Sequence, residues 1–233
     1  LMEEILYADS DILVAVKPAG IESQAARRFE PDMVSRLKRY LVVNKLCTPG
    51  KEPYIGVIHR LDKPVSGIMV YGRTKNAAAR LSNALQNGKI KKTYTAVVCG
   101  KPVNTVDNFV DYLEKTVDGN YSHVVDKGKT GGKRAELSYR LVDTREEAGQ
   151  ILSLLEIRLM TGRHHQIRVQ LSSRGLPIYG DRKYGGPERD FPVGIPLALC
   201  ASKLSFPHPK TGREMEFSMT PAGGAFEKFF HGE

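Results

Sequence analysis

The chain has 233 residues, of which 41% are hydrophobic and 26% charged, which is the composition of a folded globular protein and not of a disordered one. Its 35 Lys and Arg outnumber 26 Asp and Glu, and the net charge of +9 favours a polyanionic partner such as nucleic acid. No apolar run reaches the roughly 20 residues of a membrane span, and three widely separated cysteines exclude a complete disulfide framework. We therefore expect a cytoplasmic protein without a membrane segment.

The N-terminal part of the chain predicts a hairpin, two helices and two buried strands. Asp9 and Ser10 are turn formers between two β-prone runs, and Thr74 is a good N-cap before apolar residues at helical spacing. The expected elements are a hairpin at 5–7 and 12–16, a short basic helix within 31–46, strands at 55–58 and 68–70, and a helix from Thr74 to about Gln86.

The C-terminal part predicts mainly strands. Residues 101–133 are irregular and rich in Gly and Lys, so we expect a long loop or a peripheral hairpin there. The stretch "TGRHHQIRVQLSSRG" predicts a helix with Thr161 as N-cap and Gly175 as stop. The other expected elements are strands at 91–100, 135–142 and 151–159, and a strand–turn–strand unit within 196–219. Because strands outnumber helices without regular β–α alternation, we predict an α+β domain around a mixed, mostly antiparallel sheet.

Three familiar catalytic patterns fail in this sequence. "GKT" at 128–130 lacks the earlier glycine of a phosphate-binding loop, since His123 stands there, and Pro64 breaks the nucleophile-elbow pattern around Ser66. His164 and His165 are adjacent, so a helix does not aim both at one metal ion. We expect neither a phosphate loop nor a metal site.

Asp62 is the most informative residue, within "IGVIHRLDKPVSGIMV" at 55–70. It follows an apolar strand, where burial raises the pKa of a carboxyl group unless a cation is close. Arg168, beside the apolar Ile167, is a candidate partner that would keep Asp62 ionised and able to act as a nucleophile. The alternative is an aspartate that merely caps a turn among solvated neighbours.

The stretch "HRLDKPVSG" (59–67) closely resembles the central motif of the RluA-type pseudouridine synthases, written HRLD-x-x-TSG. Further blocks of the same family are matched in order by "VAVKPAG", "KKTYTAVV", "TGRHHQIRVQLSSRGLPIYGDRKYG" and "LALCASKLSFPHP". The resemblance covers nearly the whole chain. It implies an isomerase that converts uridine within RNA to pseudouridine, with no cofactor and no metal.

The resemblance also implies a fold and a set of catalytic residues. The family has a mixed, mostly antiparallel sheet in two subdomains that flank a catalytic cleft. Its catalytic aspartate falls on Asp62, its active-site tyrosine on Tyr94, and its aspartate-pairing arginine on Arg168. Tyr94 is suited to stack on the uracil and to accept a proton late in the reaction, although a strand tyrosine is often only a packing residue.

Further residues are expected to contact RNA. By the same resemblance, Arg60 enters the helical stack in place of the extruded nucleotide, a role that suits a planar cation. The other expected RNA contacts are His59, Lys17, Arg163 and His165.

This chain departs from the family pattern at three positions, because Val65 replaces a usual Thr, and Gln170 and Cys200 replace usual histidines. We expect one catalytic domain over 1–233, monomeric and without a separate N-terminal RNA-binding module, acting on a stem-loop of ribosomal or transfer RNA. Substrate choice is then expected to depend on the catalytic domain, with 101–133 and the basic segment 27–45 as candidates. The competing readings are a catalytically silent RNA-binding protein of the same fold and a hydrolase that releases free uracil.

Overall fold

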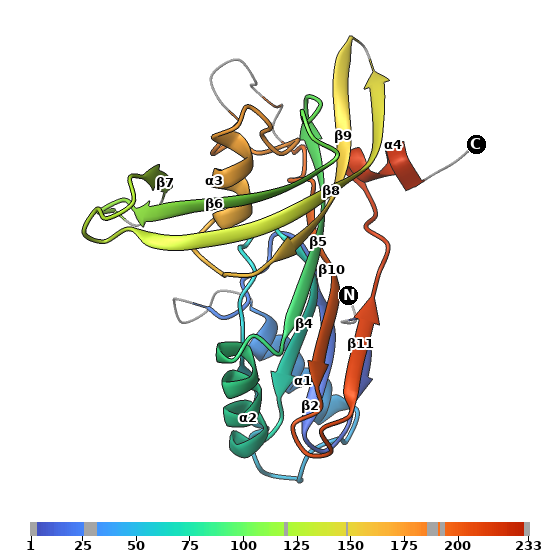
Figure 1. Cartoon of the computed structure of the whole chain (residues 1–233). Coiled ribbons are helices and arrows are strands. Elements are labelled where there is room, and N and C mark those ends of the chain that lie inside the picture. The colour runs from blue at the N-terminus through green and yellow to red at the C-terminus, as the bar shows by residue number, and fades with distance from the viewer. Residues whose placement is uncertain are drawn as a thin grey trace. The chain divides into compact units, whose positions relative to one another are not determined.

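The structure, a computed structural model, describes residues 4–25, 32–118, 121–147, 149–185, 191 and 194–230. The chain divides into two compact units (Figure 1), one formed by Leu1–Lys91 with Ala201–Met219 and the other by Lys92–Cys200 with Thr220–Glu233. Each unit carries its own run of paired strands. Within the described ranges, no helix combines the length and apolar character that a membrane crossing requires.

The first unit begins with the predicted hairpin. Strands β1 (Ile5–Ala8) and β2 (Ile12–Lys17) pair antiparallel, and Asp9 closes the turn between them by accepting hydrogen bonds from the N–H groups of Asp11 and Ile12. Strand β4 (Ser66–Gly72) pairs antiparallel with β2, and β3 (Gly56–Val57) pairs antiparallel with β4. Strand β11 (Glu214–Ser218) pairs antiparallel with β10 (Leu199–Pro207).

Two capped helices complete this unit, and both were predicted. Asp32 caps α1 (Met33–Val43) by accepting from the N–H of Ser35, and Thr74 caps α2 (Lys75–Gln86) by accepting from the N–H of Ala77. Helix α2 lies alongside β4 (Figure 1). The core beneath it is apolar and includes Ile12, Val14, Ile68, Val70, Leu81, Leu204 and Phe206.

The second unit holds a sheet of long antiparallel strands in the order β5-β9-β8-β6-β7. Their bounds are β5 (Lys91–Cys99), β6 (Val106–Lys115), β7 (Ser122–Val125), β8 (Lys133–Glu147) and β9 (Gln150–Leu159). Helix α3 (Gln166–Ser172) packs beside β6 and β7, and a short 3₁₀ turn (Gly224–Phe226) precedes α4 (Glu227–Phe230). The mixed, mostly antiparallel α+β architecture is therefore confirmed.

Two local features refine or correct the expectations. Of the two alternatives for residues 101–133, the hairpin is the one found, as β6 and β7, and β6 also pairs with β8 as a strand of the sheet. Its buried residues Phe109 and Leu113 lie four positions apart, so the sequence shows no clear alternation. Helix α3 begins at Gln166, because His165, in the left-handed region at φ 52°, precedes it, while the Thr161 hydroxyl donates to Oε1 of Gln166.

Gly67, at the start of β4, gives a direct test of this packing. Its φ is +136°, and an added Cβ would lie 2.5 Å from both the backbone N and O of Ala201. We expect Gly67→Ala to lower the free energy of unfolding in urea by about 3 kcal/mol or more. Gly88→Ala is the matched control, because φ is +67° there with no atom within 4 Å, and it should cost about 1 kcal/mol. Equal losses would show that backbone strain alone matters at Gly67.

Candidate active site

Asp62 lies in the loop between β3 and β4, with its side chain partly exposed. Its carbonyl accepts a hydrogen bond of 2.9 Å from the N–H of Val65, which closes a turn. Just before it, the N–H and the C=O of Leu61 both bond the hydroxyl of Ser23, at 3.0 and 2.8 Å. These contacts fix the backbone on each side of the carboxylate.

Lys17 lies inside the first unit and supports this loop. Its side chain is fully buried, and its ammonium donates to the carbonyls of Pro18, Ile21 and Lys63 at 3.0, 2.7 and 3.1 Å. An ammonium group has three N–H donors, so these acceptors satisfy it. This placement does not support the predicted contact of Lys17 with RNA and makes the residue part of the loop's framework.

The ammonium of Lys17 interacts electrostatically with two nearby carboxylates. Burial lowers the pKa of its amine to about 8, while the carboxylates of Glu22 and Asp62 act in the opposite direction. Asp62 therefore has a cation close enough to interact with it inside its own unit.

The two residues before Leu61 differ in exposure. His59 is buried, and its Nε2 accepts a long hydrogen bond of 3.4 Å from the N–H of Val70 in β4. Arg60 is exposed. Arg60 therefore lies at the surface of the Asp62 loop, whereas His59 is held in the packing of the loop.

In the second unit, Arg168 on α3 forms a buried bidentate ion pair with Asp181. Their Nε–Oδ2 and Nη2–Oδ1 distances are 2.8 and 2.7 Å, with the two residues only 5% and 1% exposed. Oδ1 of Asp181 also accepts from the N–H groups of Lys183 and Tyr184. The sequence alone does not identify Asp181 as the partner of Arg168, although Asp181 lies in the family block that contains "GDRKYG".

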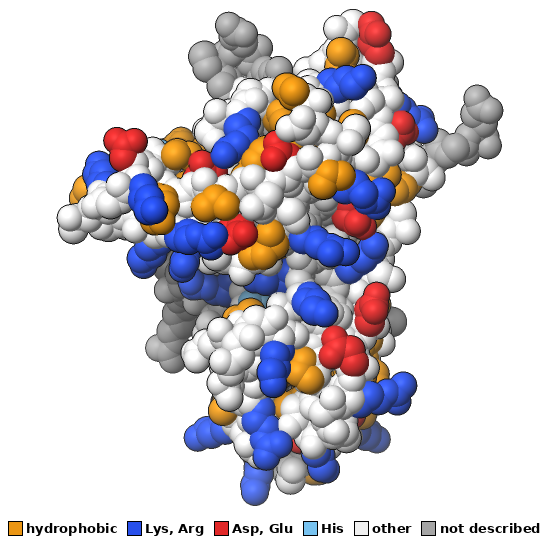
Figure 2. Space-filling view, viewed as in Figure 1, with side chains coloured by type: hydrophobic (Ala, Val, Ile, Leu, Met, Phe, Trp, Pro, Cys, Tyr) orange, Lys and Arg blue, Asp and Glu red, His pale blue; other side chains and the backbone are white. Residues whose placement is uncertain are grey.

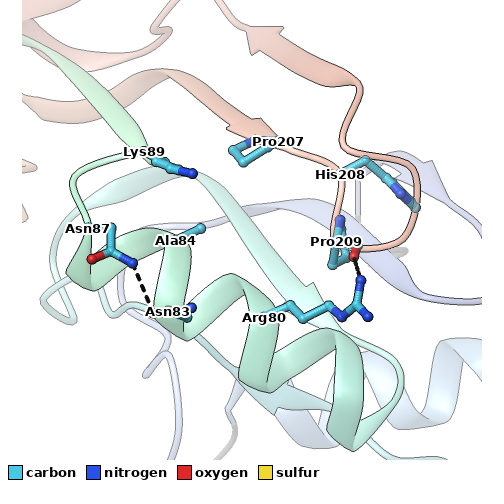
Figure 3. Close-up of a pocket in the computed structure, with 8 residues that line it drawn as sticks. All are labelled: Arg80, Asn83, Ala84, Asn87, Lys89, Pro207, His208 and Pro209. Atoms are coloured by element: carbon cyan, nitrogen blue, oxygen red, sulfur yellow. Dashed lines mark hydrogen bonds between the residues drawn. The ribbon is translucent and has the colours of Figure 1, made fainter.

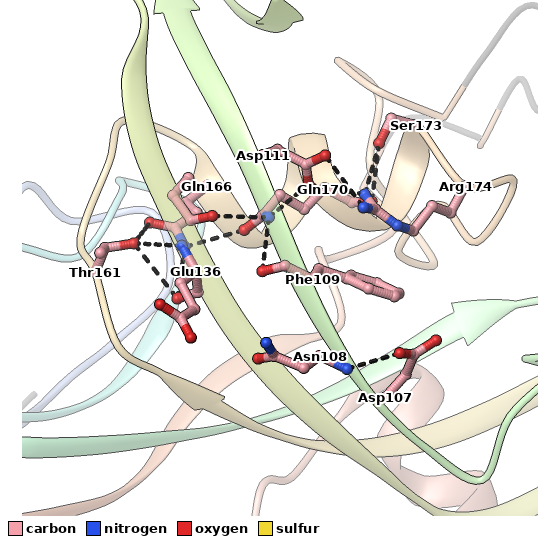
Figure 4. A network of polar contacts seen from close by, with 11 residues as sticks. Asp107, Asn108, Phe109, Asp111, Glu136, Thr161, Gln166, Gln170, Ser173 and Arg174 are labelled. Atoms are coloured by element: carbon pink, nitrogen blue, oxygen red, sulfur yellow. Dashed lines mark hydrogen bonds and ion pairs between the residues drawn. The ribbon is translucent and has the colours of Figure 1, made fainter. Parts of the chain in front are cut away.

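The sheet-facing side of α3 is held by a chain of side-chain amides (Figure 4). Gln166 donates to Oε1 of Gln170 at 3.0 Å, and Gln170 donates to Oδ2 of Asp111 at 2.7 Å. Asp111 in turn receives two hydrogen bonds from Arg174, whose guanidinium stacks on the ring of Phe109. The departure to Gln at position 170 thus has a defined structural role, which is to fasten α3 to β6.

The remaining predicted residues of this unit have distinct settings. Tyr94 is buried in β5, opposite Ile157 of β9. Arg163 is exposed, and its Nε donates to the carbonyl of Arg134 at 2.8 Å. His165 is partly buried, with its Nδ1 2.8 Å from the hydroxyl of Tyr184.

The predicted site residues thus form two groups. Lys17 and Asp62, with His59 and Arg60 in the same loop, belong to the first unit, whereas Tyr94, Arg163, His165 and Arg168 belong to the second. The pairing of Asp62 with Arg168 joins residues of different units and stays a prediction. Of the described residues, no three His, Cys, Asp or Glu side chains gather as a metal site requires.

Two surface features complete the description. Lys and Arg side chains are spread over the visible face of both units (Figure 2), in keeping with the net charge. A recess in the first unit lies between α2 and the turn after β10 (Figure 3), and its polar side chains bond locally: Asn87 to Asn83, and Arg80 to the carbonyl of Pro209. The Arg80 contact holds the turn against the helix, and the Asn87 contact lies within the C-terminal end of α2.

Comparison with solved structures identifies the class of protein that has this fold. Human RNA Pseudouridylate Synthase Domain Containing 1 superposes with a TM-score of 0.73 at 22% identity, over 93% of this chain and 82% of that one. Human RNA Pseudouridylate Synthase Domain Containing 4 gives 0.73 at 23% identity, over 93% and 87%. The fold is that of the pseudouridine synthases.

The sequence comparison identifies the family. The profile of the RNA pseudouridylate synthase family matches residues 11–173, more than half of the chain, and the chain therefore belongs to this family of RNA isomerases. Its RluA-type character is confirmed by its relatives. A ribosomal large subunit pseudouridine synthase D from Zymomonas mobilis is 34% identical over 223 residues, or 92% of this chain and 68% of the relative. A ribosomal large subunit pseudouridine synthase C from Rickettsia conorii is 32% identical over 184 residues, or 79% and 57%. The chain thus spans between 57% and 68% of the length of these two relatives.

The burial of Lys17 predicts a pH dependence of stability. The folded protein releases the Lys17 proton near pH 8, whereas the unfolded chain holds it up to the usual value of 10.5, so unfolding takes up a proton between these values. The contribution of Lys17 to the free energy of unfolding should therefore rise with pH from about 8 to 10.5. We would measure urea unfolding of the wild type and Lys17→Met across this range. Their difference should grow with pH, and a flat difference would contradict the depressed pKa.

Proposed function

We propose that this chain is a pseudouridine synthase that isomerises specific uridines in ribosomal RNA, with Asp62 as the catalytic nucleophile. The observation that carries the proposal is the family match over 11–173, a range that includes Asp62, Tyr94 and Arg168, the residues on which the sequence resemblance places the family's catalytic groups. The names of the bacterial relatives favour ribosomal RNA over transfer RNA as the substrate.

The reaction conserves all atoms of the nucleotide. The bond from N1 of uracil to C1′ of ribose breaks, the base turns, C5 forms a new bond to C1′, and the hydrogen of C5 leaves as a proton while N1 gains one. Asp62 can serve by attacking C1′, by attacking the uracil ring, or by assisting elimination to a glycal. All three routes require an ionised carboxylate, which the positive charge of Lys17 beside it favours.

Arg168 is proposed to pair with Asp62 and to orient its carboxylate. The ion pair with Asp181 supports this role, because it fixes the orientation of the Arg168 guanidinium. Tyr94 is proposed to stack on the uracil and to accept a proton late in the reaction. A pocket closed to water would protect the detached base from loss by hydrolysis.

Access to the uridine requires that the base leave its stack, at a cost of a few kcal/mol. Arg60 is proposed to fill the vacated space, a role consistent with its exposure in the Asp62 loop. Arg163 and His165 are proposed to contact the RNA, which we take to be a stem-loop bound by a cytoplasmic monomer, whereas the burial of His59 does not favour its predicted contact. The competing function, an RNA-binding protein without catalysis, fits the basic charge equally but gives no role to Asp62.

Tritium release from RNA labelled at C5 of uridine tests the proposal. The RNA comes from cells that lack the enzyme, so that its target uridine is unmodified. Wild-type protein should release tritium, and Asp62→Asn should lower the rate by at least about a thousandfold because the amide is not a nucleophile. Asp11→Asn, a change at another aspartate of the same unit, should retain the wild-type rate.

Two outcomes would contradict the proposal. Tight RNA binding without release by the wild type would favour the silent RNA-binding protein. Free uracil in place of pseudouridine would favour a hydrolase.

A further inference from the structure

Tyr184, which follows α3 in the chain, contacts both the β6–β7 hairpin and the loop before α3. The N–H of Ser122, the first residue of β7, donates to the Tyr184 hydroxyl at 2.9 Å. That hydroxyl lies 2.8 Å from Nδ1 of His165, and the Ser122 hydroxyl lies 2.9 Å from Nδ1 of His164. The two imidazole rings stack with centroids 3.7 Å apart. Ser122 of the hairpin therefore contacts His164 directly, and it contacts His165 through Tyr184.

The direction of the hydrogen bond between Ser122 and Tyr184 follows from the groups involved. A backbone N–H only donates, so the Tyr184 oxygen is the acceptor toward Ser122. The hydroxyl has a single proton, and His165 Nδ1 is its neighbour at 2.8 Å. With that proton directed at Nδ1, the His165 ring accepts at Nδ1 and carries its own proton on Nε2.

The charges around His165 favour the neutral ring that this arrangement needs. Burial lowers its pKa to about 3, and Arg168, His164 and Lys183 act in the same direction, while Asp181 acts in the opposite direction. His165 also has the left-handed backbone conformation, with φ 52°, which costs free energy for a residue other than glycine. Contacts on the ring are needed to hold such a conformation.

Tyr184 is placed to supply those contacts. Its ring lies edge-on to His165 at 5.6 Å and faces the guanidinium of Arg168 at 5.1 Å, so it connects the loop to the ion pair on α3. Its ring also lies edge-on to that of Tyr121, the residue before β7, with centroids 5.9 Å apart. The hairpin and the helix thus hold Tyr184 from two sides.

We propose that Tyr184 is a positioning residue that, locked by the β6–β7 hairpin through Ser122, fixes His165 as a neutral imidazole with Nε2–H as donor to an oxygen acceptor of the RNA. The RNA contact depends on the proposed function, whereas the tautomer does not. The proposal gives the β6–β7 hairpin a role, which is to set the hydrogen-bonding state of His165, the residue that precedes α3.

The tautomer can be measured without RNA, by NMR of protein labelled with ¹⁵N in histidine, with the His165 signals assigned by their loss in His165→Gln. The wild type should show a neutral Nε2–H ring at neutral pH that resists protonation into mild acid. Tyr184→Phe keeps the ring but removes the hydroxyl, so both tautomers should appear and protonation should begin at higher pH. Ser122→Ala keeps the N–H to Tyr184 and should perturb His164 while leaving the His165 tautomer unchanged.

Tyr139→Phe is the matched control, because it removes a tyrosine hydroxyl of the same unit that donates to the carbonyl of Asn104 at 3.0 Å. It should leave the His165 signals as in the wild type. An Nδ1–H or doubly protonated ring in the wild type would overturn the proposal. So would an unchanged His165 spectrum in folded Tyr184→Phe.

The effect on catalysis is measured with Tyr184→Phe and Tyr139→Phe in the tritium-release assay. Tyr184→Phe should raise KM for RNA by about tenfold with a smaller change in kcat, since it loosens a binding contact. Tyr139→Phe should keep both values. A wild type that releases no tritium but shows the expected tautomer would contradict the proposed function and leave the role of Tyr184 in fixing His165 supported.

Discussion

The buried ion pair between Arg168 and Asp181 is the constraint on which the second unit's site depends. Taking two charges out of water is costly, and the cost is offset only when geometry is good and the remaining lone pairs are bonded. Here the pair is bidentate, and Asp181 also accepts two backbone N–H groups. Removing either partner would leave a buried charge, so the orientation of the guanidinium is fixed by the fold itself.

Further contacts of α3 fix the helix in place around this ion pair. The amides of Gln166 and Gln170 fasten the helix to the sheet, and Tyr184 connects Arg168 to the loop that carries His165. In the first unit, buried Lys17 has a similar function, because one ammonium ties three carbonyls together beneath the Asp62 loop. Each unit therefore positions its own functional groups with a buried cation.

How far the sequence predicts this structure depends on how local the deciding interactions are. The N-cap of α2 at Thr74 was predicted correctly, because capping is decided within one turn of helix. The N-cap at Thr161 was wrong, because its hydroxyl bonds Gln166 and the N–H of Glu136 on β8, a contact distant in sequence. Asp181 was missed for the same reason, since only the folded chain shows which carboxylate accompanies Arg168. The role of Asp62 was inferred from its motif, and the structure adds the loop that holds it.

The most direct test of this account is the single-turnover rate of pseudouridine formation by Asp181→Asn at saturating RNA, with folding checked by circular dichroism. If the ion pair orients Arg168 for the chemistry, the rate should fall by at least about a hundredfold while the Kd for RNA changes by less than about threefold. Asp107→Asn, at an aspartate of β6 that bonds Asn104 at the surface, should retain the wild-type rate. A folded Asp181→Asn protein with the wild-type rate would contradict the account.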